Sequence, residues 1–165
     1  MAEIRSASPA DVPALAAILE AAEPFDRAGR VDSEGAGQWR DPDSWADVIV
    51  AEHAGALVGF GALLWPTAPD ARGADVVVHP AWRRRGVGRQ LTERLRAMLG
   101  AGGQTLQGEY ASYAPAAAGL VAALGGELIG RWHQMVADPV PDFAPPPLPE
   151  GYRLRHAVVG QDEEA

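Results

Sequence analysis

The apolar positions of this chain follow two different periods, which predicts a mixture of helices and strands. Ser8 has the form of a helix N-cap, with Pro9 at the first helical position and Asp11 three residues on to complete a capping box. The apolar residues that follow recur at helical spacing: Val12, Leu15, Ile18, Leu19 and Ala22. We therefore expect a short strand over residues 3–7 and a first helix that ends near Pro24.

The middle of the chain instead shows runs of β-forming residues. Residues 45–52 and 57–65 are two such runs, and the turn-forming residues 53–56 between them predict an antiparallel hairpin. We interpret the polar, proline-containing residues 66–73 as a connection. A continuous apolar run at residues 74–78 then predicts a buried strand.

The second half of the chain alternates helices and strands. Residues 87–98 carry apolar side chains at helical spacing, and the glycines that follow end this helix. We expect a strand over residues 105–108, an alanine-rich helix over residues 115–124, and closing strands over residues 127–129 and 132–137. This order predicts an α/β (α+β) fold, with a mixed central sheet flanked by helices.

One long segment has no steady period. Residues 25–44 carry several glycines and several acidic residues, so we expect a loop. Long irregular segments are often functional. Two interpretations stay open here, a segment that contacts a substrate and an ordinary surface excursion.

The composition changes abruptly after Asp138, where prolines become frequent. We expect a first domain over residues 1–138 and a stiff, proline-rich linker over residues 139–150. Residues 151–165 follow as a tail, in which Leu154-Arg155-His156-Ala157 echoes Ile4-Arg5-Ser6-Ala7. The tail is either the first strand of a truncated second copy of the domain or a segment that packs on the first copy.

Composition narrows the class of protein. With 165 residues, 47% of them apolar, the chain can bury one substantial core. It has no apolar run near the roughly 20 residues of a membrane span and no signal-peptide core, so we expect a cytoplasmic protein with no membrane partner. A net charge of −8 argues against binding nucleic acid. The absence of cysteine excludes disulfides, thiolate metal sites and thiol nucleophiles.

A local basic spot stands out in this acidic chain. Arg83, Arg84, Arg85 and Arg89 surround Gly86 and Gly88, between the strand predicted at residues 74–78 and the helix predicted at residues 87–98. Glycines that open a helix expose its first N–H groups to a phosphate. A P-loop would need Gly-Lys-Ser/Thr, and a dinucleotide fingerprint would need a third glycine or alanine where Leu91 stands. The pattern therefore predicts a site for another compact phosphate-bearing ligand.

The motif Arg83-Arg84-Arg85-Gly86-Val87-Gly88 in this setting resembles the Q/R-x-x-G-x-G/A motif of the GNAT-type N-acetyltransferase superfamily. The matching order of elements covers residues 3–137. The proline-rich linker and the restarting strand are also similar to tandem GNAT proteins such as the actinobacterial mycothiol synthases.

The resemblance implies an N-acetyltransferase that moves an acetyl group directly from acetyl-CoA to a primary amine of a small molecule or peptide. It implies that the fourth strand splays from the fifth, that the CoA pyrophosphate lies over the backbone amides of residues 84–89, and that Val77 or Val78 donates an amide to the thioester carbonyl. The residues so assigned to acetyl-CoA are Val77, Val78, Arg83, Arg84, Arg85, Gly86, Val87, Gly88 and Arg89.

A base is needed because an amine attacks a thioester only when it is neutral. Many members of the family carry a carboxylate on the fourth strand, and Asp75 stands at the matching place. It is either that base or an ordinary solvent-facing carboxylate. Glu109 is the second candidate, as a base or as an amine-binding anion. His79 precedes Pro80 and is more typical of a turn, and no histidine has metal-ligand spacing.

The general acid is where the chain departs from the family. GNAT proteins often carry N-x-x-A-x-x-L-Y-x-x-x-G after the fifth strand, and here Val121 replaces the tyrosine and Ala114 the asparagine. Tyr113 and Tyr110, just before that helix, are candidates for a substitute acid, and their alternative role is packing at the start of the helix. Otherwise the thiolate leaves unaided, or the domain is a noncatalytic acyl-CoA-binding or scaffolding module. A homodimer and a missing second GNAT domain are both open as partners.

Overall fold

The computed structural model describes residues 2–26, 47–100, 103–111, 114–131, 147–153 and 155–156. The chain divides into two units, Met1–Leu128 and Ile129–Ala165, and we treat each separately. The described part of the second unit contains a turn in which the Tyr152 N–H donates to the Pro149 carbonyl at 3.1 Å. The predicted boundary at residue 138 lies outside the described residues.

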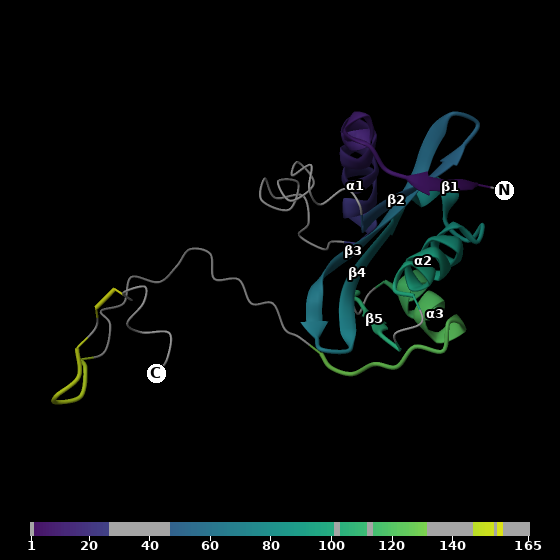
Figure 1. Ribbon diagram of the computed structural model, residues 1–165. Helices are drawn as coiled ribbons and strands as arrows, with labels where there is room; N and C mark the ends of the chain where they lie inside the picture. The colour runs from purple at the N-terminus through teal and green to yellow at the C-terminus, as the bar shows by residue number, and fades with distance from the viewer. Residues whose placement is uncertain are drawn as a thin grey trace. The chain divides into compact units, whose positions relative to one another are not determined.

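The described residues of the first unit form a five-stranded sheet with the strand order β1-β2-β3-β4-β5 (Figure 1). Neighbouring strands pair antiparallel except β4 and β5, which are parallel. The strands are β1 (Glu3–Ser6), β2 (Val48–His53), β3 (Ala56–Ala68), β4 (Ala71–Val78) and β5 (Thr105–Gln107). The helices are α1 (Val12–Asp26), α2 (Val87–Met98) and α3 (Pro115–Ala123), with 3-10 turns at Pro9–Asp11 and Pro80–Trp82.

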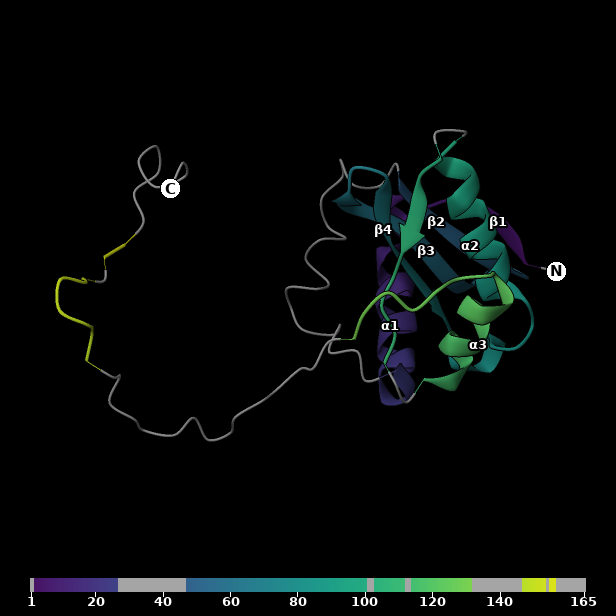
Figure 2. The same cartoon turned by 90° about the horizontal axis from the view of Figure 1, so that it is seen from below.

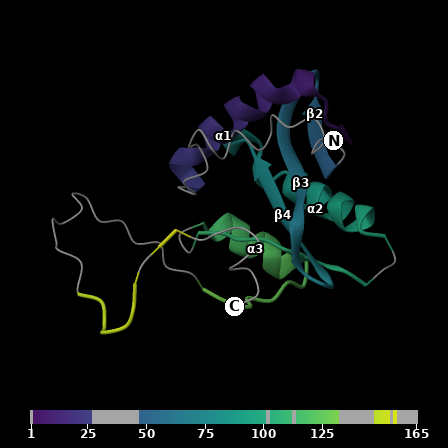
Figure 3. The ribbon, with the colours of Figure 1, turned by 60° about the vertical axis from the view of Figure 1, so that its left-hand side comes forward.

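Two hydrophobic clusters hold the helices against opposite faces of the sheet (Figure 3). The α1 face buries Leu15 and Ile18 against Phe60 and Val77, among others. The α2 face buries Leu91 and Leu95 together with Ile49 and Val58. Burying a leucine or isoleucine side chain stabilises the fold by roughly 1.5–3 kcal/mol. The helical periodicity predicted the buried faces of both helices, and the structure confirms them.

The prediction of a connection over residues 66–73 was wrong, because β3 extends to Ala68 and β4 already begins at Ala71. Pro66 lies inside β3 at an irregularity of the β3–β4 register. There the Leu64 carbonyl accepts from Arg72 Nε at 2.9 Å and Nη2 at 2.7 Å, and Nη2 also reaches Asp47 at 2.8 Å. The Arg72 side chain thus satisfies a backbone acceptor of β3 beside Pro66, where the register with β4 is irregular.

Other boundaries differ by smaller amounts. The helix α1 runs to Asp26, with Pro24 inside its last turn. Residues 127–129 form no strand, so that prediction was wrong; they follow the Gly125 and Gly126 chain reversal that ends α3. The predicted strand over residues 132–137 and most of the predicted loop over residues 25–44 lie outside the described residues.

The parting of β4 from β5 matters most for the site. These strands pair only through Ala71, Arg72 and Gly73 of β4, opposite Thr105, Leu106 and Gln107. The rest of β4, up to Val78, has no strand partner on that side within the described residues. The predicted splay of the fourth and fifth strands is therefore present. None of the helices in the described residues is long and apolar enough to cross a membrane.

Candidate functional site

The open half of β4 presents alternating backbone groups. The His79 N–H donates to the Val58 carbonyl at 3.0 Å, and the register places Val77 opposite Phe60. Because hydrogen-bonded pairs alternate in an antiparallel ladder, the polar backbone groups of Val77 and Asp75 point toward β3. Those of Val76 and Val78 point the other way, into the gap that β5 leaves.

The loop that follows β4 is held by short local contacts. In the 3-10 turn the Trp82 N–H donates to the His79 carbonyl at 2.8 Å, and His79 Nδ1 accepts from the Ala81 N–H at 3.2 Å. The Trp82 ring lies 4.6 Å from the His53 ring, and the Arg85 Cζ lies 4.8 Å from the Trp82 ring centre. This stack ties the loop to the turn between β2 and β3.

The end of the loop and the start of α2 together carry a row of unpaired backbone amides. Arg84 and Gly86 both have left-handed backbone, with φ of 62° and 81°. The first α2 bond runs from the Gln90 N–H to the Gly86 carbonyl at 3.0 Å. Within the described residues no backbone carbonyl accepts from the N–H groups of residues 84–89. Such a concave row, at the positive end of a helix dipole, is a ready site for an anion.

Different constraints favour glycine at the two glycine positions of the motif. At Gly86 an added Cβ would meet only Gln90 Nε2 at 3.7 Å, so the left-handed φ is the constraint. At Gly88 a Cβ would lie 3.3 Å from Leu120 Cδ2 and 3.6 Å from Val78 Cγ2. Gly88 therefore also lets α3 pack beside the first turn of α2 (Figure 2).

The four arginines of the basic spot differ in their surroundings. Arg83 bonds to the Val78 carbonyl and to Asp26, and Arg85 lies over Trp82. The Arg89 Nε pairs with Glu93 at 2.8 Å on the exposed face of α2. No ion pair or hydrogen bond of the Arg84 side chain occurs within the part of the chain that the structure describes. Arg84 is thus the exposed cation of the loop that is most available to an anionic ligand.

The candidate acid–base groups occupy different places. Asp75 stands in β4 opposite Ala62, half-buried, and alternation puts its side chain on the α1 face with Val77. Glu109 is exposed and follows Gly108, where an added Cβ would lie 3.0 Å from the Ala74 carbonyl oxygen. Gly108 therefore lies beside Ala74 of β4, and Glu109 is the next residue along the chain.

The candidate acids are less fully described. Tyr110 is half-buried just before α3, and Tyr113 lies outside the described residues. Val121 is half-buried, and its carbonyl accepts from the Gly126 N–H at 2.9 Å as α3 ends. No group of three His, Asp or Glu side chains able to hold a metal ion occurs among the described residues.

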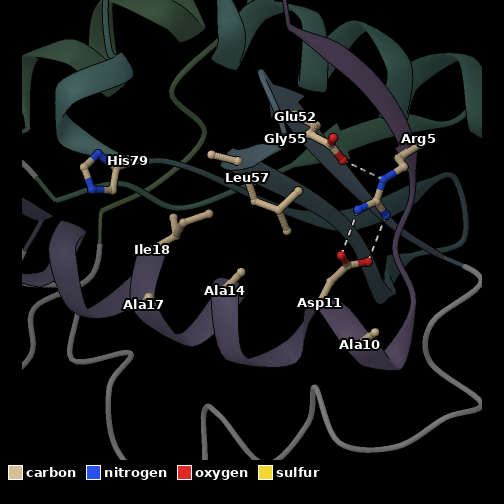
Figure 4. Close-up of a pocket in the computed structure, with 11 residues that line it drawn as sticks. Arg5, Ala10, Asp11, Ala14, Ala17, Ile18, Glu52, Gly55, Leu57 and His79 are labelled. Carbon is tan, nitrogen blue, oxygen red and sulfur yellow. Dashed lines mark hydrogen bonds and ion pairs between the residues drawn. The ribbon is translucent and has the colours of Figure 1, made fainter.

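A hollow of about 460 Å³ lies between α1 and the edge of β1, β2 and the β2–β3 turn (Figure 4). At one end Arg5 bonds to both Asp11 oxygens at 2.8 and 2.9 Å and to Glu52 at 3.1 Å. Asp11 also accepts from the Ser8 N–H at 2.8 Å. The hydrogen bonds from Arg5 hold the pKa of Asp11 well below its usual range, although burial opposes that shift.

Sequence reasoning missed this ion-paired cluster, although the signal was present. Ser8 and Asp11 were assigned to a helix cap, and the structure confirms that Asp11 accepts from the Ser8 backbone. The partner Arg5 is only six positions away from Asp11 in the chain, at the end of the first strand. Because its charges are satisfied by one another, we assign the cluster to the joining of β1, α1 and β2.

Comparisons with known proteins agree with this geometry. Residues 44–125, which hold strands β2 to β5, the loop, α2 and α3, match the family described as the acetyltransferase (GNAT) domain. The chain is 32% identical over 94% of its length to a mycothiol acetyltransferase of Salinispora arenicola, and covers 51% of that protein. The chain belongs to the GNAT acetyltransferase superfamily. Arg83–Gly88, the segment that resembles the GNAT motif, lies within the matched residues, on the loop with the unpaired amides.

Two further relatives extend the comparison. A mycothiol acetyltransferase of Thermobispora bispora is 35% identical over 99% of the chain, which covers 53% of that relative. The chain thus spans about half the length of the curated relatives it matches. A protein from Salmonella typhimurium, solved with its cofactor acetyl-CoA, superposes with a TM-score of 0.61 at 25% identity. That match covers 80% of this GNAT chain and 88% of the Salmonella chain.

Proposed function

We propose that this GNAT domain binds acetyl-CoA in the gap between β4 and β5 and transfers the acetyl group to a primary amine. The proposal rests on two sets of unpaired backbone N–H groups, one along the open half of β4 and one at the start of α2. The row of amides over residues 84–89 follows the open half of β4 after the short loop of residues 79–83. A phosphate and a thioester on one extended ligand would meet both sets.

On this proposal the CoA pyrophosphate accepts hydrogen bonds from the amides at the start of α2, where the helix dipole favours negative charge. The acyl group lies along the open half of β4. There the carbonyl oxygen gains negative charge as the amine attacks, so a backbone donor stabilises the reaction more than the ground state. Alternation favours Val78 over Val77 as that donor, because the Val77 N–H faces β3.

The acceptor must lose a proton before or during attack. We propose Asp75 or Glu109 as the group that receives it, directly or through a water. The thiolate of CoA leaves with the electron pair of the broken C–S bond, either unaided or protonated by Tyr110 or Tyr113. The curated relatives are named mycothiol acetyltransferases. A mycothiol-related amine is therefore the first acceptor to try, within the wider class of small-molecule and peptide amines.

We further propose that the working protein contains a second domain of the same kind. The chain covers 51–53% of two mycothiol acetyltransferases that it matches along nearly its whole length. The similarity of Leu154-Arg155-His156-Ala157 to residues of β1 supports a repeat. A homodimer is the other arrangement, and sedimentation of the intact protein distinguishes the two.

A noncatalytic acyl-CoA-binding or scaffolding domain is the second candidate function. The observation in its favour is Val121, which stands where the family often has its acid tyrosine. In a two-domain protein one domain can bind acyl-CoA while the other catalyses. Turnover by the isolated chain, lost in Asp75→Asn with CoA affinity retained, would exclude this candidate for the chain.

The binding half of the proposal is tested by calorimetric titration with acetyl-CoA. Gly86→Glu places a carboxylate beside the amide row and should weaken binding by well over about tenfold, since like charges repel at short range. Gly100→Glu is the matched control: Gly100 also has positive φ, of 70°, but lies at the far end of α2. Equal affinities for the two variants would mean that the phosphate site is elsewhere.

The catalytic half is tested by offering the chain and any longer form of the protein a panel of primary amines with acetyl-CoA. Release of CoA thiol that depends on the amine is the expected result. If the intact protein binds acetyl-CoA but acetylates no amine in a broad panel, the enzymatic proposal fails and the binding module stands.

A further inference from the structure

Arg83 is the first arginine of the GNAT motif, yet its guanidinium contacts the protein itself. Its Nε donates to the Val78 carbonyl oxygen at 3.1 Å, and its Nη2 pairs with Asp26 Oδ2 at 2.8 Å. Its Cζ lies 5.6 Å from the centre of the Phe25 ring. The side chain is 21% exposed, far less than the 61% of Arg89. Arg83 therefore joins the loop to the end of β4 and to the last turn of α1.

The Val78 carbonyl needs this donor because of the splay. It points away from β3, and β5 has already left β4 after Gly73. A carbonyl in that position, partly shielded from water, loses free energy unless something donates to it. The planar guanidinium of an arginine can reach it with Nε while another nitrogen holds a carboxylate. Asp26 supplies that carboxylate from 57 positions earlier in the chain.

One polar group of Val78 is left open by this arrangement. With the carbonyl occupied by Arg83, the N–H is the backbone group of Val78 that faces the gap without a partner among the described residues. A carbonyl oxygen of an acyl donor is attracted to an N–H and repelled by another carbonyl oxygen. The contact from Arg83 thus makes the end of β4 a site for an acceptor oxygen rather than for a donor.

We propose that Arg83 is a positioning residue for the acyl group and not a phosphate ligand. Anchored by Asp26, it covers the Val78 carbonyl so that the Val78 N–H alone meets the thioester oxygen. The inference rests on the proposed acetyl-CoA site and adds a role to it. It predicts that Arg83 affects the acetyl group of the ligand much more than its phosphates.

The test compares the dissociation constants of acetyl-CoA and of CoA, by calorimetry, in the wild-type chain and in five variants. In Arg83→Met the uncovered carbonyl faces the acyl oxygen, so we expect acetyl-CoA to bind about tenfold more weakly and CoA less than about threefold more weakly. Asp26→Asn should change the ratio of the acetyl-CoA and CoA dissociation constants in the same direction, by a smaller factor. The double variant Arg83→Met/Asp26→Asn should bind acetyl-CoA no more weakly than Arg83→Met alone, because the two substitutions remove the same Arg83–Asp26 contact.

Arg83→Lys and Arg84→Gln complete the design. Lysine keeps the charge but cannot hold two groups in the guanidinium geometry, so Arg83→Lys should lose the acetyl preference like Arg83→Met. It is also the variant to rely on if Arg83→Met does not fold. Arg84→Gln, at the exposed cation of the loop, should weaken both ligands by the same factor.

Two results would overturn the inference while leaving the acetyl-CoA site intact. Equal losses for both ligands in Arg83→Met, rescued by lysine and absent in Asp26→Asn, would make Arg83 a phosphate ligand. Unchanged affinity for both ligands, with only a lower melting temperature, would make it a brace with no role in binding. A wild-type chain that binds neither ligand would instead refute the proposed function itself, and the inference with it.

Discussion

Two arginine-containing regions of this domain deal with charge in opposite ways. At Arg5 every strong donor and acceptor is matched, with Asp11 and Glu52 both bonded to one guanidinium. At residues 84–89 a row of backbone donors and an exposed Arg84 have no protein acceptor among the described residues. The first arrangement stabilises the fold, whereas the second leaves hydrogen-bonding capacity for something that is not protein. Unsatisfied donors, rather than the number of arginines, mark the candidate site.

The comparison predicts that the largest effect on stability comes from the matched region. Asp11→Ala removes the carboxylate that holds Arg5 and the Ser8 N–H, at a side chain only 11% exposed. We expect a loss of about 2–3 kcal/mol in the free energy of unfolding, since it leaves a guanidinium without its main partner. Urea titration measures this loss, and calorimetry should find CoA affinity unchanged. A large loss of CoA affinity in the folded variant would break the distinction between the two regions.

The same region should govern part of the acid sensitivity. The pKa of Asp11 is lowered in the folded state by its hydrogen bonds from Arg5, so folding favours the ionised form. That stabilisation is fully present above the unfolded pKa of about 3.9 and is lost as the pH falls through the lower folded value. The free energy of unfolding, measured between neutral pH and about pH 2.5, should therefore fall less steeply below about pH 4 in Asp11→Asn than in the wild type. Identical slopes would mean that Asp11 does not contribute.

In the open region the expected effect is on binding and its salt dependence. Arg84→Gln removes a cation with no ion pair in the described residues, so the stability should change by less than about 0.5 kcal/mol. CoA affinity should fall several-fold, and its decrease with added salt should become shallower, because one charge contact is lost. Calorimetry at low and moderate salt measures both quantities. An unchanged salt dependence would place the ligand phosphates away from Arg84.

We expect the smallest change in the free energy of unfolding when the exposed ion pair on α2 is broken. Arg89 and Glu93 pair at 2.8 Å, with side chains 61% and 49% exposed. Glu93→Gln should cost only about 0.3–0.5 kcal/mol, as for other pairs of this spacing on a helix surface. Its CoA affinity should stay the same or rise slightly as Arg89 is released. A several-fold loss of affinity would show that Glu93 belongs to the site.

Periodicity and the glycine motif were sufficient to predict that the strands β1 to β5 exist, although not all of their ends, and to predict both buried helix faces and the loop at the start of α2. These features depend on neighbours in the sequence. The separate contacts of the four arginines could not be predicted, because Arg83 finds Asp26 across 57 positions and Arg85 finds a tryptophan whose orientation depends on the turn. The extension of β3 through Pro66 was missed for a similar reason. It depends on a side-chain donor, Arg72, from the next strand.

The candidate catalytic groups show the same limit. The sequence places Asp75 in β4, but only the register with Ala62 assigns its side chain to the α1 face. The choice between Val77 and Val78 likewise requires the pairing with β3, since adjacent residues in a strand look equivalent in a sequence motif. Pairing geometry converts that ambiguous pair into a testable preference for Val78.

Because β4 and β5 stop pairing early, substitutions in the two halves of β4 should have different effects. Up to Gly73, we expect substitutions in β4 to affect only the stability of the sheet. Beyond it, the backbone groups of neighbouring positions alternate between those that point toward β3 and those that point toward the proposed ligand. An N-methyl amino acid at position 77 should therefore unfold the domain, whereas the same change at position 78 should spare the fold and remove only the interaction with the ligand.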